Sequence, residues 1–239
     1  MGIMIYRDKQ AAGAAAAALI AAKLIEKPNA TLGMGVSYAA TPIYTQLVNM
    51  TAAGVVDWSE TTVFHTSELL STQPGMGTIM SFLHRNLYKQ VGMDLRRVYA
   101  PAHYANDMET ACNDFENKIL NTGGMDLILL YLGNNGHIAM NGPAREFPAF
   151  THIELLPQST MEECSMLQPQ GGDVAQAITM GLSTALSAKQ IILCAFGKGL
   201  SGTVERALNS TITPAVPASM LQLHPNVTYI FDEDAAVNL

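Results

Sequence analysis

Short apolar runs alternate with stretches of helical periodicity along almost the whole chain. The runs have the length of strands, which predicts strands over residues 2–6, 30–34, 61–64, 97–99, 125–131, 150–155, 190–196 and 227–231. Between them, apolar residues recur three and four positions apart, which predicts helices within residues 9–26, 42–50, 75–91, 108–120, 174–186, 200–208 and 219–221. Strands that alternate with helices through short loops form βαβ units. The predicted fold class is therefore α/β, a doubly wound, mostly parallel sheet with helices on both faces (Rossmann-like).

Polar and proline residues mark where the first helices begin and end. Asp8 is the expected N-cap of the helix that runs to Glu26, and Lys27-Pro28 ends it. Thr41 is the expected N-cap of the next helix, with Pro42 in its first turn. Because no internal repeat, low-complexity tract or linker interrupts the pattern, residues 1–239 are predicted to form a single domain.

The chain is organised around residues 132–143, LGNNGHIAMNGP, which directly follow the apolar run 125–131. A buried parallel strand that delivers a glycine-rich loop at its carboxyl end is typical of ligand sites in open α/β sheets. His137 lies in this loop, and an imidazole can donate, accept or carry a proton near neutral pH. The alternative interpretation is that His137 is a polar cap on the edge of the sheet.

Composition narrows the classes of partner and compartment. The chain is 49% hydrophobic, only 14% charged, and has a net charge of −7 with 13 Lys and Arg, which argues against nucleic acid as a partner. The three cysteines, Cys112, Cys164 and Cys194, are widely spaced and fit buried thiols in a reducing compartment. No run is apolar enough for a membrane span, and no signal peptide is evident, so a cytoplasmic protein without a membrane partner is expected. The apolar composition leaves room for a homo-oligomer.

The loop and several other segments resemble one known family. Gly136, His137, Ile138, Ala139, Asn141 and Pro143 fit the D-G-H-I-A-x-N-E-P signature of the glucosamine-6-phosphate isomerase/deaminase family. Further landmarks occur in the family's order: Thr41-Pro42, the strand ending at Glu68, residues 81–86 (SFLHRN) and residues 221–225 (LQLHP). The chain is similar to 6-phosphogluconolactonases in fold as well, but these landmarks favour the amino-sugar branch.

The resemblance implies catalytic positions at which this chain departs from the family pattern. The family's proton-moving aspartate corresponds to Ser67, and Glu68 beside it is either a substitute base or a cap that lies outside the pocket. The ring-opening aspartate, histidine and glutamate correspond to Asn135, His137 and Gly142. Asn135 can orient the imidazole but carries no charge. Glu146, four residues further along, is interpreted as a solvated surface carboxylate. The catalytic candidates are therefore His137, Glu68 and Asn135.

The resemblance also implies a phosphate site that is altered here. The family's Gly-Gly-Thr turn corresponds to Ala39-Ala40-Thr41, its arginine falls near Met166, and its lysine falls at Leu200. Lys198 offers a charge between two glycines at the start of a helix. The candidate substrate-binding residues are Ser37, Thr41, Ser67, Asn141 and Lys198. No cluster suggests a metal ligand set, and no cofactor is expected.

Two functional hypotheses follow, and both have a sugar or sugar phosphate as the partner. The first is an enzyme that moves a proton between the carbons of an aldose and a ketose, with standard deamination weak or absent. The second is a catalytically silent relative that binds a sugar derivative as a sensor or partner subunit. Losing a general acid or base typically costs 10² to 10⁴ in rate, so Ser67, Asn135 and Gly142 weigh against the full family reaction.

Overall fold

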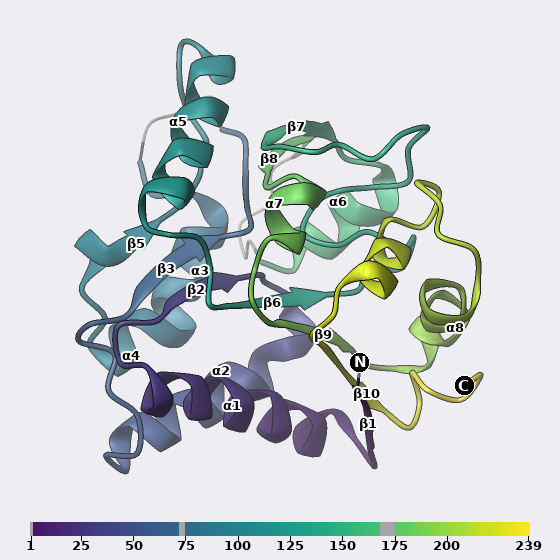
Figure 1. Ribbon diagram of the computed structural model, residues 1–239, viewed down its shortest axis with the longest axis horizontal. Coiled ribbons are helices and arrows are strands. Elements are labelled where there is room, and N and C mark those ends of the chain that lie inside the picture. Colours follow the sequence, from purple (N-terminus) through teal and green to yellow (C-terminus); the bar gives the residue numbers. More distant parts are fainter. Residues whose placement is uncertain (1, 72–74, 168–174) are drawn as a thin grey trace.

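The computed structural model describes residues 2–71, 75–167 and 175–239, and a parallel sheet forms its centre (Figure 1). In spatial order its strands are β1 (Gly2–Tyr6), β10 (Val227–Asp232), β9 (Ile191–Ala195), β6 (Leu127–Tyr131), β2 (Thr31–Met34), β3 (Thr62–His65) and β5 (Val98–Tyr99). Every neighbouring pair in this sheet is parallel. The predicted α/β fold with a mostly parallel sheet is confirmed.

Helices cover both faces of the sheet. In Figure 1, α1 and α2 lie below the sheet, and α5 and α7 lie above it. The helices and helical turns are α1 (Lys9–Glu26), η1 (Tyr38–Ala40), α2 (Thr41–Ala52), α3 (Thr78–Leu83), η2 (His84–Tyr88), α4 (Lys89–Val91), η3 (Leu95–Arg97), α5 (Met108–Asn121), α6 (Gln158–Ser165), α7 (Leu182–Leu186), η4 (Lys198–Leu200), α8 (Ser201–Asn209) and η5 (Pro217–Leu223).

The central strand β6 explains why the sheet needs cover on both sides. Its five residues are all buried, and successive side chains of a strand point to opposite faces. Leu127 and Leu129 accordingly belong to the core cluster that includes α1 and α2, whereas Ile128 and Leu130 belong to the cluster that includes α5 and α7. The continuous apolar run in the sequence is thus shared by two hydrophobic cores.

The direction of winding reverses between β2 and β6. From β2 the chain moves outward to β3 and β5, whereas from β6 it moves the opposite way to β9 and β10. In open α/β sheets, the crevice outside the carboxyl ends of the strands at such a reversal is where ligands bind. The loops after β2 and β6 are therefore the structural frame of the candidate site.

A second, antiparallel sheet was not predicted from the sequence. It consists of β4 (Ser67–Leu69), β8 (Gln176–Thr179) and β7 (His152–Leu155), in that order. The predicted helix over residues 174–186 is wrong: residue 174 lies outside the described residues, 176–179 form β8, and only 182–186 are helical. Pairing of β8 with a strand on each side outweighs the local helical period.

The predicted N-cap is confirmed for the first helix and wrong for the second. Asp8 is the N-cap of α1, and its carboxylate accepts hydrogen bonds from the backbone N–H groups of Gln10 and Ala11. Thr41 is not an N-cap, because the turn η1 precedes α2 and places Thr41 inside the helix. Its hydroxyl instead donates to the carbonyl oxygen of Tyr38, at 2.8 Å. Pro42 lies in the first turn of α2 as predicted.

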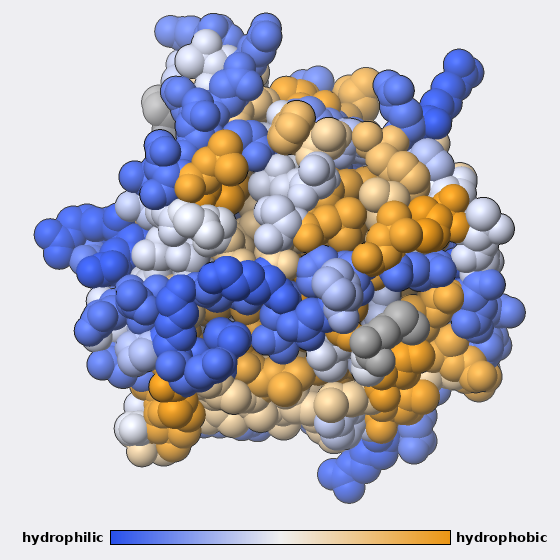
Figure 2. Space-filling view, in the orientation of Figure 1, coloured by the Kyte–Doolittle hydropathy of each residue, from blue (hydrophilic) through white to orange (hydrophobic). Residues whose placement is uncertain are grey.

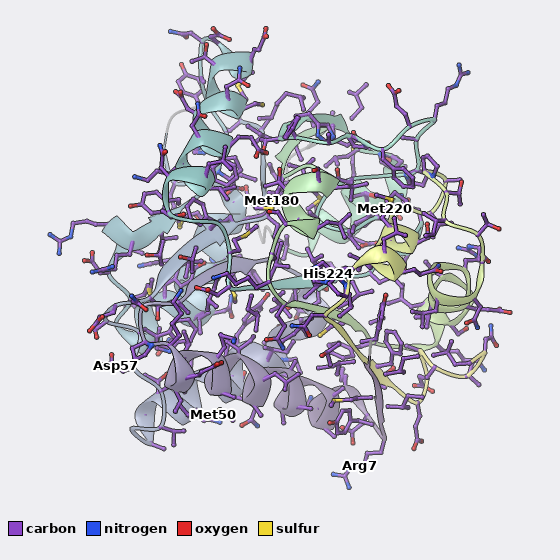
Figure 3. All side chains as sticks on the ribbon, in the orientation of Figure 1. Arg7, Met50, Asp57, Met180, Met220 and His224 are labelled. Atoms are coloured by element: carbon purple, nitrogen blue, oxygen red, sulfur yellow. The ribbon has the colours of Figure 1, made fainter. Side chains whose placement is uncertain are left out.

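Strand β1 forms one outer edge of the large sheet, and it is poorly covered. Ile3 and Ile5 are 45% and 49% exposed, and the side chain of Arg7 after the strand points away from the body (Figure 3). On the face drawn in Figure 2, further hydrophobic side chains gather on the right-hand side, between α7 and α8. In the part of the chain that the structure describes, no helix combines the length and apolarity needed to cross a membrane.

The contact between α1 and α2 depends on a glycine. A Cβ at Gly13 would lie 2.8 Å from Cβ of Pro42 and 3.3 Å from the backbone nitrogen of Ile43. We therefore expect Gly13→Ala to lower the free energy of unfolding by about 1 kcal/mol, since overpacking costs about 1–3 kcal/mol and outweighs the helix propensity of alanine. Urea denaturation measures this change.

Gly202 in α8 provides the matched control. A Cβ there would meet no atom closer than Nη1 of Arg206, at 3.8 Å. Gly202→Ala should therefore raise the free energy of unfolding by about 0.5–1 kcal/mol through helix propensity alone. A rise of similar size in both variants would contradict the close approach of the two helices.

Candidate functional site

A pocket of about 220 Å³ lies at the carboxyl ends of the central strands. Its walls include residues 35–39 after β2, residues 66–67 after β3, residues 131–134 at the end of β6 and residues 196–197 after β9. Residues 160–167 of α6 and the turn behind it contribute a further wall. The pocket therefore occupies the switch point that the strand order defines.

His137 lies in the loop after β6 and faces this pocket. Gly136, with φ of 91°, provides a left-handed turn, and Gly133 packs against the imidazole where a larger residue would collide with the ring. Oδ1 of Asn135 lies 2.8 Å from Nδ1 of His137 and accepts the backbone N–H of His137 at 3.0 Å. An amide oxygen only accepts, so Nδ1 carries the proton and Nε2 keeps its lone pair. Burial lowers the pKa of His137 to about 4.

Glu163 is a carboxylate that lines the pocket, and it was not predicted from the sequence. It lies on α6, and Oε2 is 3.8 Å from Nε2 of His137. Oε1 accepts the backbone N–H of Asn134 at 3.2 Å. Burial raises the pKa of Glu163, against the effect of that hydrogen bond. The spacing of Met161, Cys164 and Leu167, at three-residue intervals, is the signal that could have predicted this helix.

Ser67 and Glu68 point to opposite sides of β4. Ser67 lines the pocket and is 2% exposed. The carboxylate of Glu68 instead accepts the backbone N–H groups of Leu69, Ile79 and Met80, at 2.9, 2.8 and 2.8 Å. Two of these donors belong to the first turn of α3, so Glu68 caps that helix and is absent from the pocket lining. Of the two roles expected for Glu68, these contacts match the cap outside the pocket.

The other predicted binding residues divide between the pocket and its supports. Ser37 lines the pocket, while Thr41 does not. Asn141 is buried behind the wall, where its side-chain amide donates to the carbonyl oxygens of Ile138 and Met180 at 3.1 and 2.8 Å. Lys198 is exposed and does not contribute to the lining. The structure thus brings Ser37, Ser67 and His137 together and separates Thr41, Asn141 and Lys198 from them.

The remaining loop positions have structural surroundings of their own. A Cβ at Gly142 would lie 3.3 Å from Oε1 of Glu154, outside the pocket lining, and Glu146 is exposed. Ala139 has a positive φ of 52°, in the left-handed region, and lines the pocket. Cys112, Cys164 and Cys194 are free and buried, as expected. Among the described residues, no three His, Cys, Asp or Glu side chains gather as a metal ligand set would.

Two buried histidines make the stability of the fold depend on pH. Burial lowers the pKa of His65, whose Nε2 lies 2.9 Å from the Tyr88 hydroxyl, to about 3, as it lowers that of His137 to about 4. Between pH 6.5 and 4 the unfolded chain binds these protons and the folded chain does not. The contribution of these two histidines to stability therefore becomes less favourable as the pH falls. We expect each histidine to cost about 2 kcal/mol at pH 5 relative to pH 7.

Urea denaturation at pH 7, 6 and 5 tests this expectation, with His137→Gln as the comparison. The free energy of unfolding of the variant should depend less steeply on pH. Below pH 6 its slope should be smaller by about 1.4 kcal/mol per pH unit, the contribution of one proton. Equal slopes for the two proteins would mean that His137 titrates normally in the folded chain.

The fold and pocket define an α/β protein with a ligand site at the switch point, and comparisons with known proteins identify its family. A model of the family described as glucosamine-6-phosphate isomerases/6-phosphogluconolactonase matches residues 7–230. The chain therefore belongs to this family of carbohydrate metabolism, as its motifs predicted.

Similar proteins span the whole chain. It is 33% identical over 238 residues to a glucosamine-6-phosphate deaminase of Alkaliphilus oremlandii, covering 99% of both chains. It is 36% identical over 217 residues to a glucosamine-6-phosphate deaminase of Lachnoclostridium phytofermentans, covering 90% of this chain and 92% of that protein. The structure of a monomeric glucosamine-6-phosphate deaminase matches with a TM-score of 0.93 at 28% identity, covering 100% of both chains. A 6-phosphogluconolactonase from Trypanosoma brucei shares the fold, with a TM-score of 0.75 at 15% identity and coverage of 100% and 98%.

Proposed function

We propose that the protein acts on a sugar in the switch-point pocket by proton transfer of the aldose–ketose type, with His137 as the proton carrier. The observation that carries this proposal is the state of the imidazole. Asn135 holds the proton on Nδ1, which leaves the lone pair of Nε2 directed toward Glu163 at the pocket. Because burial lowers the pKa of His137 to about 4, the imidazole is unprotonated near neutral pH, as a general base must be before it takes up a proton.

The reaction needs no cofactor and consumes no net proton. The hydrogen on C2 of the open-chain sugar leaves as a proton to Nε2 of His137, and an enediol-type intermediate forms. The same proton then returns to C1, while the proton of the C2 hydroxyl moves to the former carbonyl oxygen on C1, so that C2 becomes the carbonyl carbon and C1 carries the hydroxyl. Asn135 is a positioning residue in this scheme, because it contacts the imidazole and fixes its tautomer.

We further propose that deamination of glucosamine 6-phosphate is weak or absent. The family resemblance implies a carboxylate where Ser67 lines the pocket, and a hydroxyl near its free pKa is a poor base. Glu68 cannot replace it without giving up the hydrogen bonds from the backbone N–H groups of Leu69, Ile79 and Met80. The relatives named as glucosamine-6-phosphate deaminases support the substrate family, and the pocket residues argue for a different member of it.

Proton NMR in heavy water tests the proposal. Glucosamine 6-phosphate, galactosamine 6-phosphate and their unphosphorylated forms are incubated with the protein, and the C2 proton and any ketose signals are followed. We expect loss of the C2 signal with at least one sugar. Turnover of glucosamine 6-phosphate at an ordinary enzymatic rate, about 10 s⁻¹, would contradict the proposed loss of deamination.

A catalytically silent sugar-binding protein is the second candidate, and the replacement of carboxylates favours it. Ser67 lines the pocket without a charge, and Gly142 contributes no side chain. Binding without C2 exchange for every sugar tested would support this candidate over the enzyme. A thermal shift measured with the same sugars separates binding from turnover.

A further inference from the structure

The side chains that line the pocket carry negative charge without a matching positive charge. Glu163 is the one Asp or Glu among the described lining residues, and no Lys or Arg accompanies it there. The segments 72–74 and 168–174, which lie outside the described residues, contain no Lys, Arg or His in the sequence. Met166 and Leu200 line the pocket with apolar side chains. Among the described lining residues, a phosphate would meet the carboxylate of Glu163 and no Lys or Arg side chain.

Several backbone N–H groups around the pocket already donate hydrogen bonds to acceptors within the protein. The backbone N–H of Ala39 donates to Oγ of Ser37, at 3.3 Å, and that of Ala40 donates to the carbonyl oxygen of Ser37, at 3.2 Å. The N–H of Gly197 donates to both carboxylate oxygens of Asp232, at 2.9 and 3.0 Å. The turns after β2 and β9 therefore do not direct these donors at an anion.

Two acceptors face one another across the pocket wall. Because Asn135 fixes the proton on Nδ1 of His137, Nε2 presents a lone pair. Oε2 of Glu163, 3.8 Å away, also accepts. The amide of Asn135 is held in this orientation by its Nδ2, which donates to Oγ1 of Thr160 at 3.4 Å. A ligand that supplies hydrogen to both atoms would satisfy them together.

We propose that the pocket takes an unphosphorylated amino sugar, with its ammonium group bound by Glu163 and a neighbouring hydroxyl bound by Nε2 of His137. An ammonium supplies the positive charge that the pocket lacks, and a charge-assisted bond to a partly buried carboxylate is stronger than a bond between neutral groups. Glu163 is then the residue that determines specificity. This proposal rests on the proposed function only in placing a sugar in the pocket.

Calorimetric titration with three sugars tests the proposal. Glucosamine carries the amine alone, glucose lacks it, and glucosamine 6-phosphate adds the phosphate. We expect the wild-type protein to bind glucosamine at least tenfold more tightly than either of the others. Glu163→Gln, which keeps the shape and removes the charge, should weaken glucosamine binding at least tenfold and leave glucose binding within twofold.

Glu162→Gln is the matched control, because Glu162 is exposed on the same helix and does not line the pocket. It should leave all three affinities within twofold. Tighter binding of glucosamine 6-phosphate than of glucosamine, or no binding of glucosamine at all, would overturn the proposal. If Glu163→Gln fails to fold, the three wild-type affinities still decide it.

The experiments distinguish a failure of the amino-sugar site from a failure of the proposed proton-transfer activity. Glucosamine binding that depends on Glu163, without C2 exchange, would support the amino-sugar site and contradict the proposed enzyme. C2 exchange in a phosphorylated sugar that is indifferent to Glu163→Gln would support the enzyme and overturn the amino-sugar site.

Discussion

Glu68→Ala is expected to lower the free energy of unfolding by about 3–5 kcal/mol. The side chain is fully buried, and its carboxylate accepts the backbone N–H groups of Leu69, Ile79 and Met80, the last two in the first turn of α3. Each buried donor left without a partner costs about 1–3 kcal/mol, and the first turn of α3 loses its cap. Urea denaturation followed by circular dichroism measures the change.

Glu60→Ala is the control for this prediction. Glu60 lies eight residues earlier and is exposed, so its replacement should change the free energy of unfolding by no more than about 0.5 kcal/mol. A stable Glu68→Ala protein that loses C2 exchange would contradict the capping role, and would point instead to Glu68 as a base. The experiment thereby decides between the two roles that the sequence left open.

His137→Gln is expected to reduce the rate of C2 exchange by about 10² to 10⁴, the usual contribution of a general base. Glutamine can keep a hydrogen bond in the loop but cannot take up a proton near neutral pH. The free energy of unfolding at pH 7 should fall far less than in Glu68→Ala, because His137 makes one side-chain hydrogen bond that the structure describes, to Asn135. Exchange rates are compared at saturating sugar.

His152→Gln controls for the loss of a histidine as such. His152 lies on β7, outside the pocket lining, with Nε2 3.3 Å from Glu154. Its replacement should leave the exchange rate within twofold.

Asn135→Asp should raise the rate of C2 exchange, whereas His137→Gln lowers it, since a carboxylate beside Nδ1 raises the pKa of His137 and strengthens it as a base. Unchanged exchange in His137→Gln would exclude the imidazole as the proton carrier.

Local pattern predicted most of the large sheet, because its strands are short apolar runs flanked by turn residues. Strand β1 was predicted at its observed bounds, and β6 lies within the predicted run. In the small sheet, β7 lies within the predicted strand over residues 150–155, but the sheet itself was not predicted, because β4 and β8 are stabilised by pairing between segments more than 100 residues apart. Residues 176–179 satisfy a helical period equally well, so only the neighbouring strands decide their structure.

The site was predictable to the extent that it depends on one loop. His137 and Asn135 are two residues apart, and the glycines around them indicate the turn that brings the amide to the imidazole. Glu163 could not be placed in the same way, since the spacing of Met161, Cys164 and Leu167 indicates a helix but not that this helix lies against the loop that carries His137. The alternation of Ser67 and Glu68 followed from strand geometry, but the capping role of Glu68 required the position of α3.

The left-handed backbone of Ala139 places a conformational cost in the free energy of folding and not in the free energy of ligand binding. For a residue with a Cβ this conformation costs about 1–2 kcal/mol, and it is held by the bond from the backbone N–H of Met140 to Oγ1 of Thr179, at 3.1 Å. The energetic cost of this conformation is therefore part of the free energy of folding. A ligand that contacts this wall would not have to order Ala139, so this residue adds no ordering entropy to the cost of binding.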